Sequence, residues 1–170
     1  SSQLSITTGV AGGGYSVIQI PFAPISSTGT AVTLGDDALS SALPIGFNFN
    51  FFGKTYNQFS ICSNGFISFA GNTSSLLSPV AIPNTGLPNN MIAAAWQDLN
   101  PMAGGNITYQ TIGITPNQKL LVDFTNVPHF GSTSTVTFQI TLCQSTNVIE
   151  IHTTNMSAST YYSMEGIEMD

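Results

Sequence analysis

The chain has few groups that could do chemistry, and its most concentrated oxygen donors are acidic. Asp36 and Asp37 are adjacent, and Asp98 and Asn100 lie in the segment WQDLNP. Calcium binds several carboxylate and carbonyl oxygens at once, whereas Asp and Asn side chains also cap turns. The spacing matches no EF-hand loop. We therefore expect either a calcium site built from these four residues or ordinary turn capping, and no other cofactor.

The two cysteines, Cys62 and Cys143, each belong to a run that reads as a strand, FSICSNGFISF and TVTFQITLC. If these runs are sheet neighbours, the Cβ atoms come within the ~4 Å that a disulfide needs. In an oxidising compartment such a bond contributes roughly 4 kcal/mol for a loop of this length. The alternative is a pair of free buried thiols, which pack as small hydrophobes. The sequence favours the disulfide, and it has no further cysteine or histidine pair to complete a zinc site.

His129 and His152 are the only candidate general bases. Ser132 and Ser134 lie close to His129 in the sequence, but no G-x-S-x-G elbow surrounds either serine, and the chain is rich in serine throughout. A structural interpretation is favoured for both histidines. We expect no catalytic residues, with a hydrolase as the remaining alternative.

Three aromatic residues are candidates for a ligand platform: Trp96, Tyr56 and Tyr109. A single tryptophan is more often part of a core, since it buries a large apolar area. Sugar binding needs an exposed ring with polar neighbours, and this composition supplies many asparagines and threonines. A carbohydrate-binding module of a secreted enzyme therefore remains the alternative to a protein-binding module.

No apolar residues recur with helical spacing, whereas short β-branched and aromatic runs bounded by Gly, Pro, Asn and Ser recur throughout. We expect a single domain over residues 1–170, an antiparallel two-sheet β-sandwich of jelly-roll or immunoglobulin type with about ten strands. Asn64-Gly65 predicts a tight turn between two strands, with a bulge in one bent strand as the alternative. Residues 70–90 predict a long loop of the kind that often carries function. The expected strands are 15–20, 31–33, 45–51, 59–63, 65–69, 91–96, 107–112, 119–124, 135–143, 148–153 and, less regularly, 165–168.

Charge narrows the choice of partners. The chain has two Lys or Arg residues, eight acids and a formal net charge of −6. Binding to nucleic acid needs several cations on one face, so it is not expected. No apolar run reaches the length of a membrane span, so membrane insertion is not expected either. A surface rich in Ser, Thr and Asn is typical of extracellular β proteins.

The ordered series of motifs resembles a β-sandwich module of large secreted bacterial surface and adhesion proteins, of Bacteroidetes type, and more loosely the nidogen-like domain of animal matrix proteins. The matching segments are the glycine-aromatic run 46–53, SNGFISF at 63–69 and PNNMIAAAWQDLNP at 88–101. Their order and spacing carry the likeness, since each motif alone is weak.

The resemblance implies a non-catalytic module outside the cell or on its surface, which acts in adhesion or structure. Its partners would be a protein or a glycan at a surface, and self-association is one form such contacts take. The resemblance also implies a further strand after residue 170, missing through truncation or supplied by a neighbour.

Overall fold

The computed structural model describes residues 3–8, 14–71, 79–157 and 163–169. The described residues form these strands and one short 3-10 helix: β1 (Gln3–Thr8), β2 (Tyr15–Ile18), β3 (Thr30–Ala31), β4 (Leu43–Phe51), β5 (Lys54–Cys62), β6 (Phe66–Ser68), β7 (Met91–Trp96), η1 (Pro101–Ala103), β8 (Asn106–Ile112), β9 (Lys119–Pro128), β10 (Thr135–Cys143), β11 (Ile149–Met156) and β12 (Met164–Glu168).

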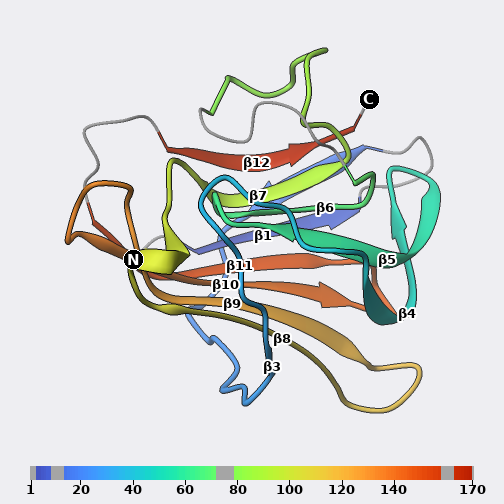
Figure 1. Ribbon diagram of the computed structural model, residues 1–170. Helices are drawn as coiled ribbons and strands as arrows, with labels where there is room; N and C mark the ends of the chain where they lie inside the picture. Colours follow the sequence, from blue (N-terminus) through green and yellow to red (C-terminus); the bar gives the residue numbers. More distant parts are fainter. Residues whose placement is uncertain (1–2, 9–13, 72–78, 158–162, 170) are drawn as a thin grey trace.

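The strands build two antiparallel sheets that pack face to face (Figure 1). One sheet has seven strands in the order β2-β1-β11-β10-β9-β8-β3, and the other has five in the order β12-β7-β6-β5-β4. The predicted all-β sandwich is confirmed, with twelve strands in the described residues rather than about ten. The additional strand is β1, QLSITT, which was not among the expected strands and which pairs with β2 and β11.

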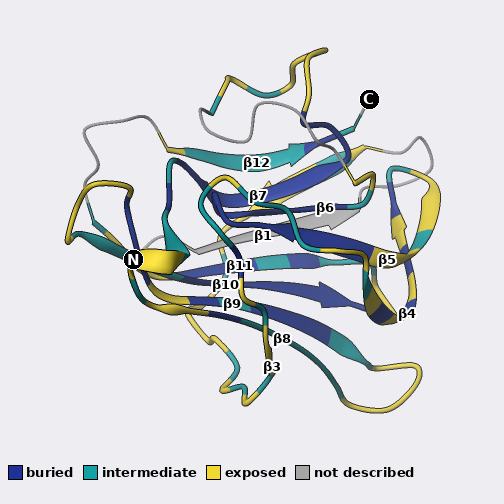
Figure 2. Ribbon diagram, viewed as in Figure 1, coloured by how far each residue is buried: buried dark blue, intermediate teal, exposed yellow. Residues whose placement is uncertain are grey.

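The main core lies between the sheets and is built by alternation along the strands (Figure 2). In β4 every second residue is buried, which places three phenylalanines in the core. In β10 the predicted inward residues Val136, Phe138, Ile140 and Leu142 are all buried there. At the accepted value of about 25 cal/mol per Å² of apolar surface removed from water, such burial is the largest stabilising contribution.

A second, smaller apolar cluster lies on the outer face of the five-stranded sheet. It contains Cys62, Phe66, Met91, Ala93 and Trp96, all fully buried. The loops before β4 and before β7 cover it, through Leu39 and Ile82 respectively. This cluster explains why β7 is buried on both faces.

A β-bulge in β7 decides which way its last residues point. The backbone N–H groups of Ala94 and Ala95 both donate to the carbonyl oxygen of Gly65, at 3.2 Å each. Two residues of β7 therefore oppose one residue of the neighbouring β5–β6 hairpin, which shifts the alternation by one residue. As a result Trp96 faces the outer cluster, while Ala94 and Ala95 both face the main core. Strict alternation along this strand would place Ala94 and Trp96 on one face, and the bulge separates them.

The segment FSICSNGFISF forms a hairpin, as predicted. Cys62 pairs with Phe66, so the connection has three residues, Ser63, Asn64 and Gly65. Only Gly65 has positive φ, +85°, which is typical of a three-residue loop that ends on a left-handed glycine. A two-residue turn of the primed type lies between β4 and β5, where Phe52 and Gly53 both have positive φ.

The predicted disulfide between Cys62 and Cys143 is wrong. β5 pairs with β4 and β6, and β10 pairs with β9 and β11, so the two cysteines belong to different sheets. Cys62 lies in the outer cluster of one sheet, whereas Cys143 lines a pocket with Lys119 and Glu150 beside the other. Both are free, buried thiols.

Candidate functional site

Asp36 and Asp37 form a turn that is fastened to the end of β5. Leu39 pairs with Cys62 as an isolated bridge, and Ala38 exchanges hydrogen bonds with Ser63, from its own N–H to Oγ at 2.9 Å and from the Ser63 N–H to its carbonyl at 2.8 Å. Asp37 has a φ of +48°, a conformation that Asp tolerates better than most residues. The adjacent acids therefore hold a defined position beside the hairpin loop.

Asp98 follows the bulged strand β7 and is held by the loop between β9 and β10. Its carbonyl oxygen accepts the N–H of Phe130 at 3.0 Å, and Leu99 forms an isolated bridge with His129. The bulge and this bridge together fix the direction in which the Asp98 side chain leaves the chain.

Asn64 joins the two acidic segments. Its side-chain amide donates to Asp37 Oδ1 at 2.7 Å, and its side-chain oxygen accepts the N–H of Leu99 at 2.8 Å. Its carbonyl oxygen accepts the N–H of Gln97 at 3.2 Å. This fully buried asparagine thus bridges the first turn to the segment that carries Asp98. The sequence indicated its place in a turn, but not this bridging role.

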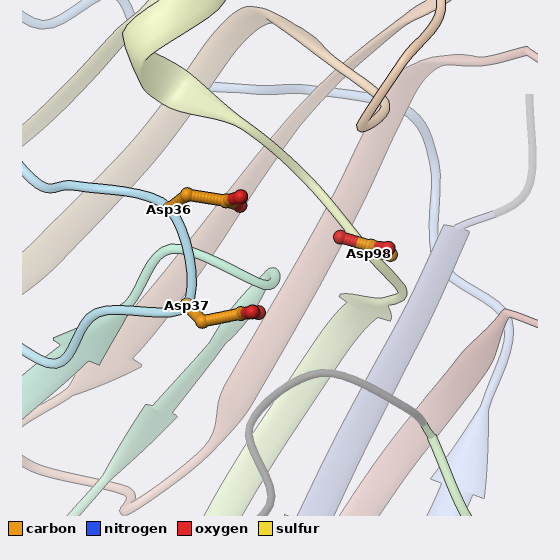
Figure 3. A group of neighbouring side chains, drawn as sticks. All are labelled: Asp36, Asp37 and Asp98. Atoms are coloured by element: carbon orange, nitrogen blue, oxygen red, sulfur yellow. The ribbon is translucent and has the colours of Figure 1, made fainter.

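Figure 3 shows the three carboxyl groups converging, with Asp36 and Asp37 extending from one loop toward Asp98 at the end of β7. One ligand atom from each of the three lies within 4.8 Å of the others. Asp36 Oδ1 and Asp98 Oδ1 are buried, with no hydrogen-bond partner in the described part of the chain. Such oxygens have lost their water and gained nothing in exchange, which is unfavourable.

The electrostatics of the cluster oppose its ionisation. Burial, followed by repulsion from Asp37, raises the pKa of Asp36, and a hydrogen bond from the Asp37 backbone opposes that rise. Burial, followed by repulsion from Asp37 and Asp36, raises the pKa of Asp98. A cation between the carboxylates would remove both penalties.

The donor set fits a calcium ion. Calcium–oxygen bonds measure about 2.3–2.6 Å, so two ligands on opposite sides of one ion are separated by about 5 Å, and the three acids satisfy this limit. The fourth predicted ligand, Asn100, has another role. Its side-chain oxygen accepts the N–H of Met102 at 3.0 Å and caps η1. The structure thus brings three of the four predicted ligands together, the calcium site itself stays a prediction, and turn capping explains the fourth residue.

The two histidines are buried at separate places. His129 is 5% exposed and His152 is 3% exposed. Burial lowers the pKa of both, and a nearby Glu150 partly offsets this for His152. Ser132 and Ser134 contact His129 only through backbone hydrogen bonds among those found in the described residues.

The three aromatic candidates pack inward. Trp96 is completely buried and stacks edge-on against Phe66, so it has no face to offer a ligand. Tyr56 and Tyr109 are partly buried against the main core, where they contact Phe69 and Phe59. The bulge in β7 is the physical reason that Trp96 turns into the outer cluster.

No helix in the described residues is long and apolar enough to span a membrane. The comparisons with curated proteins and with solved structures returned no match. Among protein-family models, the one described as NIDO related matches residues 14–168. This range contains the three acids and eleven of the twelve described strands, including the whole five-stranded sheet. The chain therefore belongs to the NIDO-related family.

Proposed function

We propose that the chain is a non-catalytic extracellular module for adhesion or structural interaction. We further propose that calcium held by Asp36, Asp37 and Asp98 orders the loops that carry these acids. NIDO-related domains are typically extracellular. The observation that carries the calcium assignment is the convergence of three carboxyl groups, two of which bury an unpartnered oxygen. A parent protein on a bacterial cell surface is part of the same proposal.

The loops around the three acids also offer apolar surface to a partner. Phe130 is 52% exposed and Met102 is 74% exposed. Both residues are hydrogen-bonded to the segment 98–100. The N–H of Phe130 donates to the carbonyl oxygen of Asp98, and the N–H of Met102 donates to the side-chain oxygen of Asn100. An ion that fixes this segment would therefore fix two exposed apolar side chains for contact with a protein, including a second copy of the chain.

A bead-clustering assay tests the proposal. Beads that carry the domain should cluster with each other, or bind beads that carry matrix proteins, in millimolar calcium and separate in chelator. Asp98→Asn should abolish the calcium dependence. Glu150→Gln is the control and should keep it, because the Glu150 carboxylate pairs with Lys119 and is not one of the three acids. Binding that is equal in calcium and chelator would contradict the role of the ion, and no binding to any protein would contradict the interaction module.

The absence of catalysis has its own test. Generic ester, peptide and glycoside substrates should not be turned over. Turnover that disappears in His129→Ala would show a hydrolase instead.

Carbohydrate binding is the second candidate, and one groove favours it through hydrogen-bonding side chains, since the two phenylalanines that line it, Phe124 and Phe138, are buried. The groove has a volume of about 510 Å³ and lies on the outer face of the seven-stranded sheet, between residues 24–27 and strands β8 to β10. Hydroxyl and amide side chains line it, among them Asn106, Thr125 and Thr137. Retention on polysaccharide columns that Asn106→Ala and Thr137→Val both weaken would favour this function over protein binding.

A further inference from the structure

Glu168 is a buried acid with half of its carboxylate unused. It ends β12, which is an edge strand of the five-stranded sheet (Figure 1), it is 2% exposed, and it contacts the loop that precedes β7 through Asn84. One carboxylate oxygen, Oε1, accepts the N–H of Asn84 from that loop. The other, Oε2, is buried without a hydrogen-bond partner in the described part of the chain.

The two neighbouring asparagine side chains already make hydrogen bonds. Asn84 Oδ1 accepts the N–H of Gly86 at 2.7 Å. With its amide nitrogen turned toward them, the Asn89 side chain donates to the carbonyl oxygens of Asn84, Gly86 and Pro88 at 3.0–3.2 Å. These bonds shape the loop beside Glu168, and Glu168 Oε2 is left without a hydrogen-bond partner among the described residues.

Among the residues that the structure describes, neither lysine lies beside this acid. The chain contains two Lys or Arg residues. Lys119 pairs with Glu150 beside the other sheet, and Lys54 begins β5 at the far hairpin of the five-stranded sheet. A buried carboxylate without a counter-charge is unfavourable, so a cationic ligand that reaches it gains an interaction with little competition from water.

The space next to Glu168 selects the kind of cation. A pocket of about 390 Å³ adjoins it, lined by Pro83, Asn84, Thr85, Asn89, Glu168 and Met169. This volume exceeds a bare ion, and a calcium ion needs six or more oxygens. Lysine and arginine side chains combine an apolar stem with a cationic head, which suits walls of proline and methionine around a carboxylate.

We propose that this pocket binds a lysine or arginine side chain of a protein partner, with Glu168 Oε2 accepting a hydrogen bond from the cationic head. The net charge of −6 attracts basic partners before contact. The inference goes beyond the proposed function, because it names the chemistry of a partner contact at a site away from the three aspartates.

Small probes test the pocket without a known partner. Nα-acetyl-lysine methylamide and Nα-acetyl-arginine methylamide are titrated into isotope-labelled protein at saturating calcium, with NMR detection. The neutral norleucine analogue is the control ligand. We expect millimolar binding with shifts at Thr85, Asn89 and Met169, and at least tenfold weaker binding of the norleucine probe.

Two variants make the result specific. Glu168→Gln keeps the shape of the side chain and should weaken binding of the cationic probes at least tenfold, while Glu150→Gln should not. Thr85→Lys places a cation at the exposed rim and should block the probes even if Glu168→Gln fails to fold.

Three results would overturn the assignment: equal binding of the norleucine probe, unchanged binding in folded Glu168→Gln or in Thr85→Lys, or no shifts at these residues up to 50 mM probe. Because calcium is saturating throughout, the outcome is independent of whether the three aspartates bind it.

Discussion

At the scale of single residues, the three aspartates differ from ordinary surface acids by what surrounds them. Asp37 is exposed and hydrogen-bonded to Asn64, whereas Asp36 and Asp98 each bury one unpartnered oxygen. Protons and a metal cation therefore compete for the carboxylate oxygens of this cluster.

This competition predicts a pH dependence. The folded-state pKa of Asp36 and of Asp98 is raised above the ordinary value of 3.8. Folding then favours their protonated forms, so without calcium their contribution to stability is present below pH 3.8 and is lost as pH rises through the raised values. Calcium needs the ionised forms, so its stabilising effect should appear over the same window and be complete by pH 7.

Melting temperatures at pH 4, 5, 6 and 7, with and without 5 mM calcium, measure this effect. Asp98→Asn is the control, because it removes one of the two raised groups and should flatten the profile. A calcium-induced shift of equal size at pH 4 and pH 7 would contradict the account.

The cysteines give a second residue-scale prediction. Burial raises the pKa of Cys62 to about 12, and burial followed by the charge of Glu150 raises the pKa of Cys143. Both should stay protonated at neutral pH and react slowly, since the thiolate is the nucleophile. A thiol assay should detect two thiols after denaturation and less than one within minutes in the native protein. Reductant should leave the melting temperature unchanged, and a linked Cys62–Cys143 peptide would show that this is wrong.

At the scale of elements, the β5–β6 hairpin loop and the bulge in β7 form one unit. Gly65 accepts both bulge N–H groups, and a Cβ built on it would lie 2.2 Å from the carbonyl oxygen of Ala95. Asn64 beside it positions Asp37 and the segment of Asp98. A change in this loop should therefore reach the acidic cluster.

Gly65→Ala tests that connection. The combination of positive φ and a close backbone atom should destabilise the fold by about 2–4 kcal/mol and weaken calcium binding. Gly53→Ala is the matched control, because Gly53 has a φ of +79° with nothing within 4 Å of its Cβ. It should cost only about 1–2 kcal/mol and leave calcium binding intact. Both variants are measured by denaturant unfolding and by calcium titration. Equal effects of the two changes would contradict the prediction that the β5–β6 loop positions the three acids.

The sequence predicted the elements better than their contacts. Strands 91–96 and 135–143 have the expected bounds because their β-branched and apolar residues mark a buried strand locally. The bulge depends on the carbonyl of Gly65 in the β5–β6 hairpin loop, so the direction of Trp96 was not predictable from alternation. The cysteine pairing failed for the same reason, since neither strand's partner is encoded in its own sequence. The acids were visible as donors, but their meeting depends on the bridge between Leu39 and Cys62.

At the scale of the whole molecule, the sandwich separates its candidate contact sites. The acidic loop end, the groove beside β8 to β10 and the pocket at Glu168 involve different segments. A module that meets several partners at once would need this separation.

Net charge sets one whole-molecule expectation. With a formal charge of −6 and two basic residues, the protein should not be retained on immobilised DNA, even at low salt and in chelator. Retention that falls with added salt would show a cationic face that the charge distribution does not indicate.

The most direct test of the central claim is a calorimetric calcium titration of metal-free protein at pH 7. The account predicts one saturable site with a Kd of about 10⁻⁴–10⁻³ M, the range of extracellular calcium modules, and its loss in Asp98→Asn but not in Glu150→Gln. No binding heat up to 10 mM calcium, together with a melting temperature that calcium does not raise, would contradict it, as would an unchanged isotherm in folded Asp98→Asn.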